Sequence, residues 1–259
     1  MKIVVCVKQV PDSAAKVVAE NGRPNWGDAP LVINPWDEYA VETALLQKEA
    51  FDGDVIAISI GGENAKEALK HALAMGATEA ILISDPALAQ ADSQSIAESL
   101  AAAIRKLGDV DLALFGRQAI DSDTGVTPAQ TGRILGWPVL SMVGALTSLD
   151  PAAKTIKVER NTEEGRQVVS SKLPAVVSVV KDIAEPRYPS FMGIRKASRA
   201  EIPVWGVADL GLSNISARVT WPEVINPPTR EVVTEMITGS SAQEIAEKLA
   251  NRILEEKVL

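Results

Sequence analysis

The sequence predicts an α/β protein with a doubly wound, mostly parallel sheet, antiparallel strands at one edge, and an extended C-terminal arm followed by a terminal helix. Two observations predict the sheet. Short apolar runs rich in Val and Ile recur along the first half of the 259-residue chain, and stretches with helical spacing separate them. Strands that alternate with helices indicate parallel pairing through crossover connections.

The predicted parallel strands are continuous apolar runs, as is typical of strands covered on both faces. They lie at residues 2–7, 54–60, 79–84 and 111–115. After about residue 136 the rhythm changes, and strand-like runs follow one another with little helix between them. These runs lie at residues 138–143, 155–160, 167–172 and 175–180. The turn-rich NTEEG inside this group predicts a hairpin, and hence antiparallel edge strands.

The predicted helices have recognisable ends. Asn34 and Pro35 supply a cap and a first-turn proline, Asp92 supplies a second cap, and Thr127 with Pro128 opens a further helix. A glycine follows the last periodic residue of three helices, which is typical of a helix C-terminus. These glycines are Gly76, Gly108 and Gly136.

A change in composition predicts a boundary near residue 181. Residues 1–181 form the α/β domain, and residues 182–259 form a second part that wraps a partner. Between residues 182 and 240 the chain has six prolines and few periodic runs, yet it carries apolar side chains such as Trp205 and Trp221. The stretch 241–258 has the apolar spacing of an amphipathic helix.

Composition excludes several classes of protein. The net charge of −8 argues against nucleic-acid binding, which needs a basic surface. One cysteine and one histidine argue against a disulfide framework, a thiolate metal cluster and a histidine-based catalytic triad. Cys6 lies inside an apolar strand and is interpreted as an inert buried thiol. We expect no membrane insertion, because no run approaches the roughly 20 apolar residues of a spanning helix. We expect a cytoplasmic location, because no targeting segment is visible.

Ligands of doubly wound sheets bind at the carboxyl ends of the parallel strands, so four loops are candidates for a site. They are residues 8–12, 34–37, 61–64 and 116–127. The last is the most informative, because it places glycines, hydroxyls and two aspartates before a helix N-terminus, where an anion such as phosphate is favoured. Asp121 and Asp123 either bind a ribose hydroxyl or a phosphate-bound cation, or cap the turn; spacing alone favours capping.

The glycine pair of the loop 61–64 has two interpretations. Gly61 and Gly62 either let a phosphate approach the backbone or serve a tight turn. None of the loops matches a Walker A lysine loop or the dinucleotide pattern G-x-G-x-x-G. No further set of ligands accompanies the acidic pair, so no metal site is predicted.

Five segments together resemble the electron transfer flavoprotein beta subunits. They read MKIVVCVKQVPD, NPWDEYAVETAL, HALAMGATEA, GRQAIDSDTG and EPRYPSFMGIRKA. The likeness extends from the first strand to about residue 203. It implies a heterodimer with an alpha subunit that carries the redox-active FAD, and a nucleotide, FAD or AMP, bound by this chain. By carry-over, that nucleotide is bound by Val7, Asn34, Pro35, Trp36, Asp37, Gly61, Ala65, Gly116, Gln118, Asp121, Ser122, Asp123, Thr124, Gly125, Val126 and Thr127.

The resemblance also implies that flavin dehydrogenases dock on the loop 185–195. Phe191 takes the place of the family's exposed apolar anchor, although a phenylalanine in such a loop is more often packed beneath it. The residues carried over to docking are Glu185, Pro186, Arg187, Tyr188, Phe191 and Met192. No catalytic residue is implied, so we expect an electron carrier and not a stand-alone enzyme, with NADH-dependent bifurcation conceivable only in a complex.

The chain departs from the family pattern in two places. Gly125 and Val126 replace the Asn and Gln of members that bind AMP, whereas Asp121-Ser122-Asp123-Thr124 shares the Asp-x-Asp-Thr of bifurcating members, which hold a second FAD. This similarity favours FAD slightly. Asn161 follows Arg160 where the family tends to place an acidic residue facing the flavin domain, so that ion pair between subunits is in question.

Two hypotheses from other functional classes fit the sequence less well than an electron carrier. A nucleotide-binding stress or signalling module of the same topology acts as a homodimer and has no need of the long arm. An ATP-cleaving, ligase-type domain needs a phosphate loop of serine and glycine after the first strand, and residues 7–11 read Val-Lys-Gln-Val-Pro.

Overall fold

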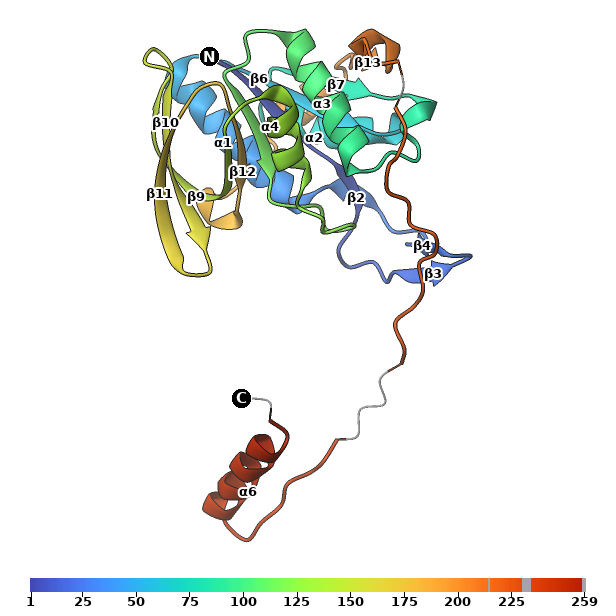
Figure 1. The fold of residues 1–259 in the computed structure, drawn as a ribbon, viewed down its shortest axis with the longest axis vertical. Coiled ribbons are helices and arrows are strands. Elements are labelled where there is room, and N and C mark those ends of the chain that lie inside the picture. The colour runs from blue at the N-terminus through green and yellow to red at the C-terminus, as the bar shows by residue number, and fades with distance from the viewer. Residues whose placement is uncertain (214, 230–233, 258–259) are drawn as a thin grey trace. The chain divides into compact units, whose positions relative to one another are not determined.

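The computed structural model describes residues 1–213, 215–229 and 234–257 (Figure 1). Contacts group the chain into two compact units, Met1–Val224 and Ile225–Leu259. The first unit contains the whole sheet, and the second contains the terminal helix. The boundary predicted near residue 181 from the change in composition differs from this contact boundary, and it stays a prediction.

A nine-stranded sheet forms the centre of the first unit, with the strand order β11-β10-β9-β12-β8-β1-β6-β7-β13. The parallel part consists of β1 (Lys2–Cys6), β6 (Asp54–Ile60), β7 (Glu79–Ile83), β8 (Leu112–Gly116), β12 (Ala175–Val179), β13 (Val204–Trp205) and their neighbour β9 (Val139–Asp150). Two antiparallel strands, β10 (Thr155–Thr162) and β11 (Gly165–Lys172), complete one edge. The predicted fold class, including the hairpin, is confirmed.

Helices cover both faces of the sheet (Figure 1). Alternate residues of β1 divide between two cores: Ile3 and Val5 pack with the side chains of α1 (Pro35–Phe51) and α2 (Lys66–Met75). Val4 and Cys6 face the other core, with α3 (Ser93–Leu107) and α4 (Thr127–Leu135). This double burial explains why the strand sequences are continuously apolar.

Short elements complete the first unit. They are β2 (Gln9–Pro11), β5 (Leu31–Ile33), β3 (Val18–Glu20), β4 (Arg23–Asn25), η1 (Glu63–Ala65), η2 (Pro86–Leu88), η3 (Lys181–Ile183), α5 (Phe191–Ala197) and η4 (Ala208–Leu210). Strand β2 pairs with β5, and β3 pairs with β4. The predicted helix stops at Gly76, Gly108 and Gly136 are present, and Asp92 caps α3 by accepting from the N–H of Ser95.

Part of the segment predicted as extended is folded. After residue 182 the chain forms α5, and β13 then pairs with β7 at the edge of the sheet. Helix α5 is too short for its periodicity to stand out in the sequence, and it forms because Ser190 caps it and Ala197 is buried. The extended part of the arm therefore follows β13 and η4.

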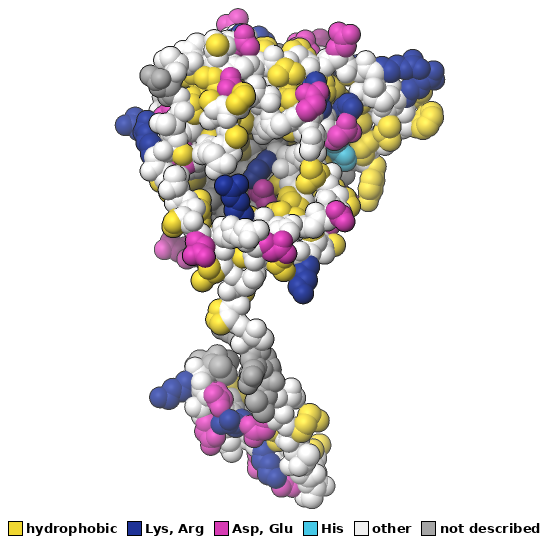
Figure 2. Space-filling view, turned by 90° about the vertical axis from the view of Figure 1, so that its right-hand side faces the viewer, with side chains coloured by type: hydrophobic (Ala, Val, Ile, Leu, Met, Phe, Trp, Pro, Cys, Tyr) yellow, Lys and Arg dark blue, Asp and Glu magenta, His cyan; other side chains and the backbone are white. Residues whose placement is uncertain are grey.

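The second unit contains α6 (Ala242–Glu255), capped by Ser241. Its apolar side chains Ile245, Leu249 and Leu254 are exposed, and Figure 2 shows hydrophobic side chains gathered on one side of this unit. The predicted amphipathic helix is thus present, except that Val258 lies outside the described residues. Within the described ranges, no helix is both long and apolar enough to cross a bilayer.

Candidate functional site

The strand order places a topological switch point between β1 and β8. From β1 the chain proceeds to β6 and β7 on one side, then returns to β8 on the other side of β1. Ligands of open α/β sheets bind at such a point, outside the carboxyl ends of the strands. Three of the predicted loops meet there: the residues after β1, the turn before α1, and the loop 116–127 after β8.

Asn34 joins these three loops. Its N–H donates to the carbonyl oxygen of Lys8 at 2.8 Å, its side-chain amide donates to the carbonyl oxygen of Gln118 at 2.8 Å, and its Oδ1 accepts from the N–H of Ile120 at 3.2 Å. The residue is fully buried. Asn34 does occupy the predicted cap position of α1, but its side chain makes no capping hydrogen bond, because the β8 loop uses both of its polar atoms.

Asp37 lies beneath the same junction and is buried. Its Oδ2 accepts from the N–H of Lys8 at 2.8 Å, and the side-chain amide of Asn34 and the N–H of Gly116 are further donors. Burial raises the pKa of Asp37 to about 7, against the opposing effect of these donors. A Cβ atom on Gly116 would overlap Asp37 and lie 2.6 Å from the carbonyl carbon of Trp36. Glycine at position 116 therefore lets β8 approach the start of α1.

Lys8 and Asp121 form an ion pair across the switch point. The Nζ atom of Lys8 lies 2.7 Å from both carboxylate oxygens of Asp121. The amide of Gln118 donates to Asp123, whose φ of 53° is left-handed. Within the described chain neither aspartate caps α4, since its first turn has no side-chain cap. The capping interpretation favoured by spacing is therefore not the arrangement in the structure.

The turn 124–126 exposes backbone donors beside this ion pair. The N–H groups of Thr124, Gly125 and Val126 donate to no other described residue. Gly125 has a φ of 61°, and α4 starts directly afterwards at Thr127. Free N–H groups at an uncapped helix start favour an anion.

The remaining predicted site residues line the same edge of the sheet. Val7 and Gly61 follow β1 and β6, which are adjacent strands, and a Cβ on Gly61 would lie 2.9 Å from that of Ala65. Pro35 and Trp36 start α1, and the guanidinium of Arg117 lies 5.7 Å from the Trp36 ring centre. Ser122 lies between the two aspartates of the β8 loop. The structure thus brings the predicted residues to one edge.

Comparisons with known proteins assign the family. The family model "Electron transfer flavoprotein domain" matches residues 27–210. The CarD subunit of the caffeyl-CoA reductase-Etf complex of Acetobacterium woodii is 37% identical, with all of both chains covered. The electron transfer flavoprotein subunit beta of Clostridium acetobutylicum is 34% identical over 99% of each chain, and the protein FixA of Azorhizobium caulinodans is 34% identical over 83% of this chain and 79% of its own.

The chain belongs to the electron transfer flavoprotein family, among its beta subunits. This confirms the resemblance that the sequence motifs indicated. An electron transfer flavoprotein is associated with a flavin and works with a partner subunit, so this chain is an electron transfer subunit of a larger assembly.

The segment predicted to dock dehydrogenases projects from this flavoprotein subunit. The side chains of Tyr188, Phe191 and Met192 are 94%, 79% and 68% exposed. The alternative that Phe191 packs beneath its loop is therefore not what the structure has. Arg187 differs from these neighbours, because its guanidinium is directed to Glu42 and Glu49 of α1. Glu185 is exposed and Pro186 is half-buried.

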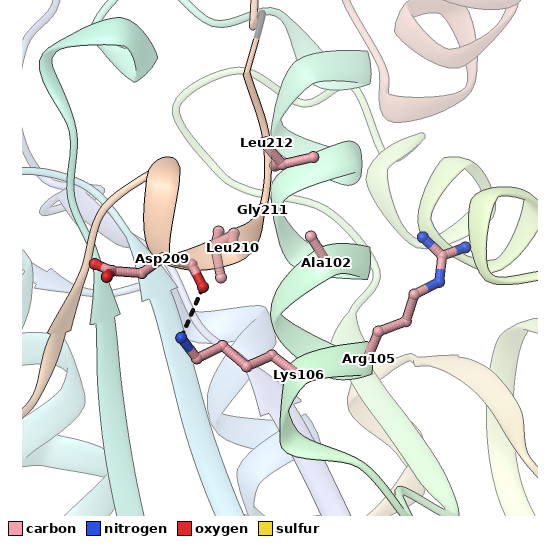
Figure 3. Close-up of a pocket in the computed structure, with 7 residues that line it drawn as sticks. All are labelled: Ala102, Arg105, Lys106, Asp209, Leu210, Gly211 and Leu212. Atoms are coloured by element: carbon pink, nitrogen blue, oxygen red, sulfur yellow. Dashed lines mark hydrogen bonds between the residues drawn. The ribbon is translucent and has the colours of Figure 1, made fainter.

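A surface pocket away from the switch point is lined by residues that bond to one another. It lies between the end of α3 and η4 (Figure 3), where Lys106 donates to the carbonyl oxygen of Asp209 at 2.7 Å and covers the Trp205 ring. Arg105 also bonds within the chain, because its guanidinium donates to the carbonyl oxygen of Ile134. Among the described residues, no group of three or more His, Cys, Asp or Glu side chains is placed to hold a metal ion.

Sequence reasoning missed two members of the site. Lys8 lies in the candidate loop 8–12 but is not among the predicted binding residues, and Ile120 supplies an N–H to Asn34. The signal for Lys8 is a lysine that directly follows the first strand in a chain whose β8 loop carries two aspartates. Nothing in the sequence marks Ile120, because its contribution comes from the backbone.

Proposed function

We propose that this subunit binds FAD at the switch point between β1 and β8 and, paired with an alpha subunit, passes electrons between flavins. The observation that carries the proposal is the convergence of three loops on Asn34 and the Lys8–Asp121 pair. The loops are fixed to one another by partly buried hydrogen bonds, which supports the preorganisation that a binding site requires.

The residues present fit a nucleotide with phosphates. The N–H groups of residues 124–126 and the uncapped start of α4 are donors for phosphate oxygens. Gly61 and Gly125 allow the ligand close to the backbone, since neither has a side chain. Lys8 offsets the charge of Asp121, which would otherwise oppose a phosphate. When bound, FAD supplies the electron-accepting ring system, and the protein binds and orients it.

FAD is proposed over AMP because of the loop sequence. Asp121-Ser122-Asp123-Thr124 shares the Asp-x-Asp-Thr of family members with a second flavin. Gly125 and Val126 lack the side-chain amides of members that bind AMP, so the contacts here come from the backbone. With FAD in this subunit, electron bifurcation from NADH becomes a possible activity of the assembly.

We propose that the arm and α6 of this chain bind an alpha subunit, and that flavin dehydrogenases dock on residues 185–195. The arm exposes Val219, Trp221, Ile225 and Met236, and α6 exposes its apolar face. Apolar side chains in this quantity support a permanent partner. The exposed Tyr188, Phe191 and Met192 support a separate docking site.

The test is the nucleotide content of the purified heterodimer. The chain is co-expressed with an alpha subunit, bound nucleotides are released with acid, and FAD and AMP are quantified by chromatography. A second FAD per heterodimer, without AMP, is expected. AMP in place of the second FAD would contradict the choice of ligand, and a heterodimer with the alpha-bound FAD alone would contradict the site.

A pair of glycine variants locates the site. Gly125→Glu puts a side chain and a negative charge into the turn 124–126, so we expect loss of the second nucleotide only. Gly165→Glu is the matched control, because Gly165 also has a positive φ, of 121°, and lies in open space in the β10–β11 hairpin. Equal nucleotide content in the two variants would place the ligand elsewhere.

A further inference from the structure

Arg187 is the most heavily bonded side chain of the proposed docking segment, and its partners are Glu42 and Glu49 of α1. Its Nε lies 2.8 Å and 3.1 Å from the two carboxylate oxygens of Glu42, and Nη2 lies 2.9 Å from Oε1. Its backbone N–H donates to Glu42 Oε2 at 3.0 Å, and Nη1 lies 2.5 Å from Glu49 Oε1. Such forked pairs fix the direction of both side chains as well as their separation.

Glu42 makes this anchor strong because it is buried. Only 4% of its surface is exposed, and it lies in the middle of α1, packed among core residues. A buried carboxylate needs a cation or several donors, and Arg187 supplies both. Glu49 lies two helical turns further along α1 and is more exposed. It pairs with Nη1 of the guanidinium. The docking segment is therefore tied to α1 across 145 residues of sequence.

A second anchor holds the other end of the segment. Helix α5 packs against α2, and a Cβ on Gly193 would overlap the carbonyl oxygen of Ala74 at the end of α2. Ser190 caps α5 by accepting from the N–H of Gly193 at 2.9 Å. The chain between Arg187 and Gly193 is fixed at both ends, and Tyr188, Phe191 and Met192 project from this fixed part.

We propose that Arg187 is a positioning residue that holds the apolar docking side chains in place through Glu42 and Glu49, and that it does not itself contact the docking protein. The inference rests on the proposed docking function of residues 185–195. A segment ordered before binding loses less conformational entropy on binding, so the anchor increases affinity without adding a contact. The electron-transfer step itself is expected to be unchanged, since the partners of Arg187 are Glu42 and Glu49 and neither belongs to the candidate nucleotide site.

The anchor is tested by hydrogen–deuterium exchange of the purified heterodimer, without any docking protein. Arg187→Gln is expected to speed exchange at the amide of residue 187 about tenfold or more, because this N–H donates to Glu42 in the anchored segment. Arg187→Lys keeps the charge but loses the fork, so it is expected to give an intermediate rate. Arg199→Gln, at an exposed arginine outside the segment, is the matched control and is expected to change nothing.

Docking is tested with a purified flavin dehydrogenase that exchanges electrons with the wild-type heterodimer. Arg187→Gln and Phe191→Ala are each expected to raise KM for the heterodimer about tenfold with kcat unchanged. Because Arg187 acts through Tyr188, Phe191 and Met192, the effects of Arg187→Gln and Phe191→Ala on KM are expected to be less than additive in the double variant. An additive effect would mean that Arg187 contacts the dehydrogenase directly and would overturn the proposal.

The two measurements separate the possible failures. Unchanged exchange in Arg187→Gln would overturn the anchor, whatever the dehydrogenase assay shows. Faster exchange combined with an unchanged KM in both Arg187→Gln and Phe191→Ala would leave the anchor in place as a structural feature and overturn the docking function of the segment.

Discussion

Helix α1 holds two buried carboxylates by different means. Asp37, in its first turn, is held by backbone N–H groups at the nucleotide end, whereas Glu42, in its middle, is held by the guanidinium of Arg187. Neutral donors do not offset the cost of burying a charge fully, and burial raises the pKa of Asp37 to about 7. A guanidinium keeps its charge at all relevant pH values, and Glu42 raises the pKa of Arg187 further. One end of α1 is therefore sensitive to pH, and the other is a fixed anchor.

The largest expected effect on stability comes from removing the cation of the Arg187–Glu42 pair. Arg187→Ala leaves Glu42 buried without its cation, so we expect the free energy of unfolding to fall by about 3–5 kcal/mol. Glu42→Ala is expected to cost less, because Arg187 is more exposed than Glu42 and regains water. Urea unfolding of the purified heterodimer measures both. The double variant should recover part of the loss, and a double variant as unstable as Arg187→Ala would contradict the pair as its cause.

The next effect concerns the pH-sensitive end. The pKa of Asp37 is about 7 in the folded protein, against an ordinary value of 3.8 for the unfolded chain. Between these pH values the folded state therefore holds a proton on Asp37 that the unfolded state has lost. The free energy of unfolding therefore falls as pH rises from about 4 to about 7, and is level above. Asp37→Asn keeps an acceptor for Lys8 and removes the titration. Relative to wild type, the variant should gain about 2–4 kcal/mol between pH 4 and pH 7.5.

Urea midpoints of wild type and Asp37→Asn over this pH range measure the difference. A constant offset between the two proteins would show that Asp37 does not titrate there.

A smaller effect tests the close packing that buries Asp37. Gly116→Ala places a Cβ against Asp37 and Trp36, and is expected to cost about 1–3 kcal/mol through displacement of the start of α1. Gly62→Ala is the control, because Gly62 has a φ of −74° and no atom within 4 Å of an added Cβ. Thermal unfolding compares them. Equal stabilities would mean that β8 and α1 are less tightly joined than the structure shows.

The smallest effect compares an exposed ion pair with the buried one. Lys8 and Asp121 are 44% and 19% exposed in their side chains, so Lys8→Gln is expected to change the free energy of unfolding by only about 0.2–1 kcal/mol. Its effect should instead appear as weaker retention of the nucleotide through gel filtration. A stability loss as large as that of Arg187→Ala would contradict a binding role for this pair.

Much of this protein could be predicted from local patterns. Apolar runs such as 54–60 identify the parallel strands, and Asp92 and Gly108 identify the ends of α3, because these signals act within a few residues. The loops of the candidate site are likewise predicted from local order, since each follows a predicted strand or precedes a predicted helix. Helix α5 escaped prediction because seven residues show too little periodicity and its packing partner is distant in sequence.

Sequence alone determined the α/β class, the family and the loops at the carboxyl edge of the sheet, because chain order, apolar periodicity and motif spacing are local properties. Only the tertiary structure decided how polar side chains are used. Asn34 has the sequence signal of a helix cap, but its side chain joins the start of α1 to the β8 loop. Arg187 is predicted to contact a partner, but its guanidinium is held by Glu42. Lys8 pairs with Asp121 at the candidate site. Those roles depend on groups that are 84, 145 and 113 residues apart along the chain, and folding alone brings them within hydrogen-bonding distance.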